Sequence, residues 1–312
     1  MAEINSLVPT VVNDVSIHFG LFPSRMDGKA KCHWSDKATF DCYVCGANTV
    51  ERHQRFHKRF LQNPPDRLAM GPGQVHTEMR ALEWCIIAST HQDIKTRSDD
   101  HPQAYLVESR LKALQDEAFE RIGVRLSKCS GGNQGTSNNG PTAKACFEDP
   151  VLMAEVFKLP VWMVKGIKCQ IRALSACNVD IDPEVQRAKG QDWLDLFHDS
   201  QWAWNTLTPT MHSLFWHSWA MIKLFPFPIG LSSEEGSEGD NKVVRLDRAH
   251  HTPQKGLKDQ LKALMHRSHQ KANPRILRLT PDPVRPERSL DYIQDWIAKP
   301  QPPLQPPPPI EE

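Results

Sequence analysis

Apolar side chains recur at helical spacing through the middle of the chain. One run places them at intervals of three and four residues, at Val107, Leu111, Leu114, Ala118 and Ile122. This spacing lines one face of an amphipathic helix. The same mostly helical pattern extends from about residue 77 to about residue 224. We therefore predict a long helical region whose apolar faces pack into a core.

Two of these helices carry clear start signals, and one stretch interrupts the pattern. Asp149-Pro150 and Asp182-Pro183 each place a capping side chain before a proline at the first helical position. Residues 129 to 145 are rich in Gly, Asn and Ser, and their backbone amides could receive a phosphate before a helix. The stretch lacks the Gly-Lys-Ser/Thr ending of a nucleotide-binding loop, so we expect a plain flexible loop.

Outside the helical region the pattern changes. Residues 15 to 26 predict one strand or two short strands, with Asp27 just past the end. Residues 46 to 60 predict a short basic helix. Pro226 to Ile229 predict a rigid turn, after which Ser232 and Glu235 fit a capping box that begins a helix carrying Glu238.

The chain is long enough to bury a sizeable core, but its end is different. Its 312 residues suggest one large or two modest domains. Many of its 25 prolines fall in the last forty residues. From about Ala272 onward we therefore expect a disordered or polyproline II tail, which could dock on a proline-binding module.

The formal net charge of +1 predicts no nucleic-acid partner by itself, but basic residues are concentrated. Between Asn241 and Arg278, ten Lys and Arg stand against two Asp, a net charge of +8. Such a segment attracts polyanions, so we expect sequence-tolerant, salt-sensitive DNA binding. The DNA-binding candidates are Lys242, Arg245, Arg248, Lys255, Lys258 and Lys262.

Three absences narrow the cellular context. The first residues show no basic region followed by an apolar run, so no signal peptide is predicted. No apolar stretch approaches the roughly 18 residues that a membrane span needs. Eight cysteines without regular disulfide spacing fit a reducing compartment. We expect a soluble, intracellular protein without a membrane partner.

Cys42 and Cys45 have the spacing of a zinc knuckle. Two histidine pairs could complete the site. The local pair is His53 and His57, although the residues between Cys45 and His53 are fewer than a finger loop normally spans. The distant pair is His212 and His217, which a helix would place on nearly the same face. Spacing alone leaves both pairs open.

Several motifs occur in an order that resembles a known family. They are Asn5-Ser-Leu-Val-Pro, Met26-Asp-Gly-Lys, Cys42-Tyr-Val-Cys-Gly, Asn139-Gly-Pro-Thr-Ala-Lys, Pro209-Thr-Met-His-Ser-Leu-Phe-Trp-His, and Pro228-Ile-Gly followed by Ser-Glu-Glu and Glu-Gly-Asp-Asn-Lys. Together they resemble the C-terminal part of the Transib transposases, relatives of the catalytic subunit of the V(D)J recombinase. The resemblance runs from about Glu3 to about Arg278.

The resemblance implies an RNase H-like DDE core that a helical insertion interrupts, acting on DNA in the nucleus with two Mg²⁺ ions. It matches Asp27 to the second catalytic aspartate and Glu238 to the catalytic glutamate. It also assigns the zinc ligands, choosing the distant histidine pair: Cys42, Cys45, His212 and His217. Carboxylates suit Mg²⁺, whereas thiolate and imidazole suit Zn²⁺.

One part of the family pattern is missing. The residues before Asp27 are too few for the strands and helix that would present a first catalytic aspartate. Two glycines, Gly236 and Gly239, also flank Glu238 and loosen its helix. We therefore expect weak or vestigial Mg²⁺ binding, and no DNA cleavage by this chain alone.

The fold class we predict is α+β. It comprises partial RNase H-like strands with the zinc knuckle at 1–60, a helical insertion at 61–224, the glutamate helix and basic segment at 225–271, and a disordered tail at 272–312.

The favoured function is a truncated or host-retained recombinase fragment that binds zinc and DNA and is inactive alone. One alternative is an active DDE nuclease whose first aspartate lies upstream. The other is a non-enzymatic helical interaction module with a small finger. A homodimer is a further partner prediction.

Overall fold

The computed structural model describes residues 10–12, 15–17, 40–71, 73–92, 94, 104–129, 138–232, 246–250, 256–271, 290 and 292–298. The chain divides into two compact units, which we describe separately. The first comprises Met1–Ser233 together with Ile293–Glu312, and the second is Glu234–Tyr292.

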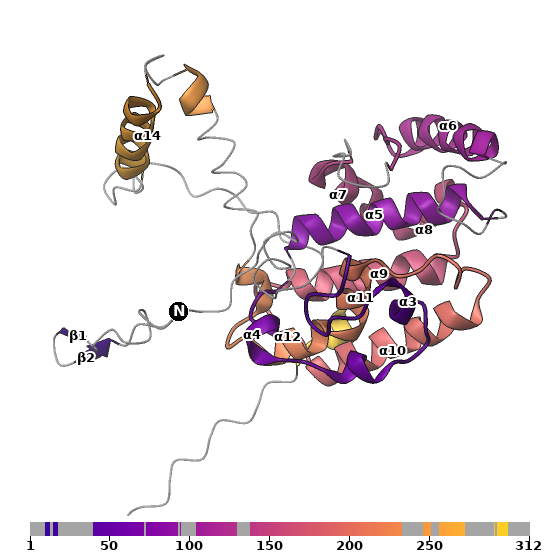
Figure 1. Cartoon of the computed structure of the whole chain (residues 1–312), viewed down its shortest axis with the longest axis horizontal. Helices are drawn as coiled ribbons and strands as arrows, with labels where there is room; N and C mark the ends of the chain where they lie inside the picture. Colours follow the sequence, from indigo (N-terminus) through magenta and orange to yellow (C-terminus); the bar gives the residue numbers. More distant parts are fainter. Residues whose placement is uncertain are drawn as a thin grey trace, which may run out of the picture. The chain divides into compact units, whose positions relative to one another are not determined.

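The first unit is built from helices (Figure 1). In chain order they are α3 (Thr49–Arg52), η1 (Lys58–Leu61), α4 (Pro65–Leu68), α5 (Gln74–Thr90), α6 (Ala104–Arg121), α7 (Gly140–Glu148), α8 (Pro150–Phe157), α9 (Val161–Ser175), α10 (Pro183–Asp199), α11 (Pro209–Trp216), α12 (Ser218–Leu224), η2 (Ile229–Ser232) and η3 (Gln294–Trp296). Helix α5 packs against α6, α7, α9 and α11, and α10 packs against α9, α11 and α12. The predicted helical region is thus confirmed.

The predicted helix starts are also confirmed. The Asp149 carboxylate accepts from the Val151 and Leu152 amides and caps α8, and the Asp182 carboxylate caps α10 in the same way. In α6 the predicted apolar stripe faces inward from Val107 to Ala118. Of the stretch at 129–145, residues 130–137 lie outside the described residues, and α7 begins at Gly140 behind an Asn139 cap.

An aromatic stack fixes α11 against α10. The Trp193 ring lies 3.8 Å from the Phe215 ring, with an interplanar angle of 12°. Gly190 permits this approach, since a Cβ there would lie 2.9 Å from the Phe215 carbonyl oxygen. Trp193 also contacts Trp84 of α5 and Trp162 of α9. The position of α11, which carries His212, is therefore set by a buried core rather than by a surface loop.

The predicted α+β, RNase H-like fold is wrong for the part of the chain that the structure describes. Its only described strands are β1 (Thr10–Val12) and β2 (Val15–Ile17), an antiparallel pair. Two strands of three residues cannot form the layered sheet that an RNase H-like core needs, because independent sheets need three or more strands with a buried face. The described chain is instead helical.

Two smaller predictions also need correction. The basic helix expected at 46–60 is two short pieces, α3 and η1. The disordered tail expected from residue 272 contains an ordered segment, since η3 lies at Gln294–Trp296 with Ile293 and Trp296 buried. The prolines around this segment hid its apolar residues in the average composition.

In the second unit, α14 spans Leu257–Lys271, and residues 246–250 form one further helical turn. Arg267 Nε of α14 lies 3.3 Å from Asp247 Oδ1, and this ion pair joins α14 to the helical turn. Nowhere among the residues described is a helix both long and apolar enough to cross a bilayer.

Candidate metal centre

Residues 42 to 47 form a tight turn that carries both thiols. The Gly46 amide donates to the Cys42 carbonyl (2.7 Å), and the Cys42 amide donates to the Ala47 carbonyl (2.9 Å). Gly46 has φ of +71°, a left-handed conformation that glycine adopts without strain. The glycine directly after the second cysteine is therefore required by the turn itself.

The two histidines come from the α11–α12 junction. Helix α11 begins behind a Thr208 cap and carries His212. His217 lies just past its end, at φ −122° and ψ −14°, where the chain enters α12. Residues five apart in a continuous helix point about 140° apart, so the prediction of one shared helix face is wrong. The break after Trp216 is what lets both rings face one point.

The Cys and His side chains converge on a small volume. The four ligand atoms of Cys42, Cys45, His212 and His217 all lie within 4.8 Å of one another. Every one of these residues is buried, and none is more than 4% exposed. Among the described residues they are the single group that could hold a metal ion. They form a buried Cys₂His₂ group that could hold a metal ion.

The distances suit a tetrahedral ion. Zn–S bonds of about 2.3 Å and Zn–N bonds of about 2.0–2.1 Å put tetrahedral S and N ligands about 3.6 Å apart. Cys45 Sγ and His212 Nε2 are 3.5 Å apart. His217 Nε2 is buried and has no hydrogen-bond partner in the described structure. A metal ion would satisfy this nitrogen.

The protonation of the site also favours a cation. The hydrogen bond from Cys42 holds the pKa of the Cys45 thiol far below its ordinary value, and a bond from His212 acts in the same direction. Burial raises the pKa of Cys42 and lowers that of His212 to about 4. These shifts favour a thiolate at Cys45 beside a neutral imidazole at His212, the forms that bind metal.

Neighbouring side chains hold the ligands in place. Asn63 Oδ1 lies 2.8 Å from His217 Nδ1, so a proton on Nδ1 leaves Nε2 free to face the other ligands. The buried Arg52 guanidinium donates to the carbonyls of Ala47 (2.6 Å) and Leu207 (2.9 Å). Arg52 thus joins the cysteine turn to the segment that leads into α11.

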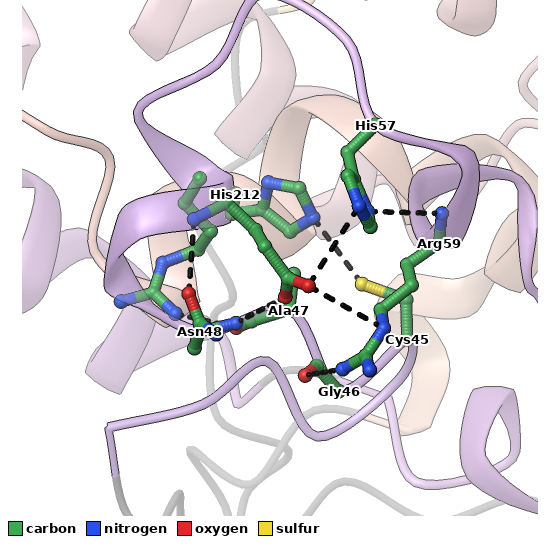
Figure 2. A network of polar contacts seen from close by, with 9 residues as sticks. Cys45, Gly46, Ala47, Asn48, His57, Arg59 and His212 are labelled. Atoms are coloured by element: carbon green, nitrogen blue, oxygen red, sulfur yellow. Dashed lines mark hydrogen bonds and ion pairs between the residues drawn. The ribbon is translucent and has the colours of Figure 1, made fainter.

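Two further arginines bind the backbone of the turn. Arg59 donates to the Gly46 carbonyl (3.1 Å), and Arg67 donates to the Val44 carbonyl (3.0 Å). Figure 2 shows Arg59 beside the turn, where it also meets the Glu51 carboxylate at 3.5 Å. Glu51 completes a capping box with Asn48 at the start of α3. Sequence reasoning missed Asn63, Arg52 and Arg67, although a basic cluster next to the cysteines was visible.

The alternative histidine pair lies elsewhere. His53 is exposed, and its Nδ1 is 3.0 Å from Thr206 Oγ1. His57 Nδ1 caps η1, and its Nε2 lies 3.7 Å from Glu51 Oε1. Neither imidazole joins the ligand group. The side chains that converge with the two cysteines are therefore those of the distant pair.

The structure describes only some of the other predicted site residues. Asp27, Glu238, Lys242, Arg245 and Lys255 lie outside the described residues. Arg248, Lys258 and Lys262 are exposed in the second unit.

Comparison with known proteins adds no further assignment. A scan against protein-family models finds no match to this chain. A search of curated proteins finds no match either.

Proposed function

We propose that this chain is a non-catalytic, zinc-stabilised helical module that associates with DNA, related to the insertion of Transib-type transposases. The observation that carries the proposal is the buried Cys₂His₂ group. Its ligands come from both ends of the helical region, so a bound ion joins the cysteine turn to the α11–α12 junction.

The ligand set favours zinc in a structural role. Thiolate and imidazole are soft and borderline ligands that select Zn²⁺ over Mg²⁺ or Ca²⁺. Structural zinc sites are closed by four protein ligands, whereas catalytic sites keep a position for water. Cys42, Cys45, His212 and His217 supply four ligands and are fully enclosed. This arrangement leaves no position for a reacting water, so the centre stabilises the fold rather than performing chemistry.

The relation to Transib transposases is supported by the order of the sequence motifs. That resemblance names the same four zinc ligands that the buried group contains. The proposal covers the helical module alone, because the described chain offers no layered sheet on which catalytic carboxylates could be arranged.

Metal content tests the proposal directly. Purified wild-type chain should hold one zinc, measured by elemental analysis, whereas His212→Ala should lose it and His53→Ala should retain it. Both variants remove a histidine, but only His212 belongs to the buried group. Retention of zinc by His212→Ala with loss from His53→Ala would refute the assignment.

The DNA part of the proposal is supported by the concentration of positive charge in residues 241–278. Substituting Lys255, Lys258 and Lys262 together by Gln should weaken binding to any duplex. If each contacts a phosphate, the slope of log K against log salt should decrease by up to about 2.7.

The matched control removes the same charge from exposed lysines of the helical unit, at Lys112, Lys144 and Lys223. This variant should bind DNA like the wild type. Equal weakening of both variants would show that net charge alone is responsible and would exclude a defined basic segment.

A further inference from the structure

A short segment near the C-terminus docks on the helical unit as an extended strand. Ile297 forms an antiparallel bridge with Ile181, in the connection between α9 and α10. Two amide-to-carbonyl bonds of 2.8 Å flank the bridge, from Asp182 to Trp296 and from Ala298 to Asp180. This is how a bound peptide adds one strand to an exposed backbone edge.

Two apolar side chains anchor the segment. Ile293 is fully buried and Trp296 is 4% exposed, while Gln294 and Asp295 between them are exposed. Side chains three residues apart in a 3₁₀ turn point the same way, so η3 directs both anchors to one side. In Figure 1 this yellow segment lies among the helices of its unit.

The receiving surface is separate from the main core. Cys169 and Ala173 of α9, together with Ala176 and Ile181 beyond its end, are buried but do not belong to the principal apolar cluster. Burial raises the pKa of the Cys169 thiol to about 11, and the Asp295 carboxylate adds to this increase.

The segment reaches this surface after a long excursion of the chain. The chain leaves the helical unit after Ser233 and returns to it at Ile293. The residues from Glu234 to Tyr292 form a unit of their own. A tether of this kind confers an effective concentration in the millimolar range at most. The same segment from a second copy has identical anchors and can therefore compete for the surface.

We propose that the surface around the Asp180–Asp182 backbone is a docking site for a peptide of the pattern Ile-x-x-Trp-Ile. In one chain it holds that chain's own Ile293–Ala298 segment. The segment exchanges with the same segment of a second copy, so that two chains join by reciprocal swapping.

Binding of a labelled peptide covering Leu290–Ala298 to the full chain, measured by fluorescence anisotropy, tests the docking site. The Trp296→Ala chain should bind the peptide at least about tenfold more tightly than the wild type, because its own segment no longer competes. The Gln294→Ala chain, changed at an exposed position of the same segment, should behave as the wild type. A peptide with Ala in place of Trp should not bind.

If the Trp296→Ala chain loses helical structure by circular dichroism, Ala298→Pro serves instead, because it removes one amide donor and leaves both anchors. Equal peptide binding by wild-type and variant chains, or binding by neither, would overturn the docking site.

Exchange is tested by mixing two wild-type chains with different affinity tags at high concentration. Recovery of one tag should bring the other with it. This recovery should persist with Gln294→Ala and disappear when both chains carry Trp296→Ala. Peptide docking without recovery of mixed wild-type pairs would overturn the exchange between copies.

Discussion

Asn63 is expected to control metal affinity without binding the metal. Its Oδ1 lies 2.8 Å from His217 Nδ1, and His217 is fully buried, so no water replaces this partner. Asn63→Leu would leave a buried N–H without an acceptor and free the ring to turn. Loss of such a partner typically lowers metal affinity by about 10–100-fold, which is about 1.4–2.8 kcal/mol. Asn63→Asp keeps an acceptor and should retain or increase affinity.

The assay is competition for zinc with a chromophoric chelator, using the folded chain at constant pH. Gln62→Ala is the matched control, because Gln62 is the adjacent exposed residue. It should leave the affinity unchanged. Wild-type zinc affinity in Asn63→Leu would refute the reasoning, since the imidazole would then need no partner to hold its orientation.

Three further predictions concern stability. Arg52→Met should lower the free energy of unfolding by about 2–4 kcal/mol in urea titrations, because the buried guanidinium donates to two backbone carbonyls. Arg55→Met, at an exposed arginine, is the control and should lower it by less than about 1 kcal/mol. Gly230→Ala should lower the thermal midpoint, because its Cβ would lie 2.3 and 2.4 Å from two carbonyl oxygens at the end of α9; an unchanged midpoint would show that the backbone can move apart. In the metal-free chain the free energy of unfolding should fall as pH drops from 6.5 to about 4, because unfolded His212 takes up a proton that the buried ring does not bind; His212→Gln should reduce this dependence, and the part that remains belongs to Cys45, whose pKa is also lower in the folded chain.

Local features of the fold were predictable because they depend on neighbouring residues. The stripe from Val107 to Ala118 repeats within a few turns of helix, and the Asp149 and Asp182 caps act on amides two and three residues away. The histidine pair that meets the cysteines could not be predicted from neighbouring residues. Cys45 and His212 meet through the packing of α11 on α10, which no local spacing encodes.

The errors have physical causes as well. The α+β prediction extended a family likeness to short apolar runs that do not by themselves specify a sheet. The tail prediction averaged over many prolines and so overlooked Ile293 and Trp296, two anchors in a segment otherwise polar or proline-rich. Asn63 and Arg52 carry no motif, because their roles arise only when distant segments fold together.

The split ligand set also has a consequence for synthesis. Cys45 and His212 are 167 residues apart, so at about 5–20 residues per second the histidine leaves the ribosome roughly 8–33 s after the cysteine. During this interval both thiols of the knuckle lack their imidazole partners and are open to oxidation or to a competing metal. A nascent chain that stalls before α11 therefore carries two thiols without their imidazole partners, and an ion that needs all four ligands can bind only after α11 and α12 have been made.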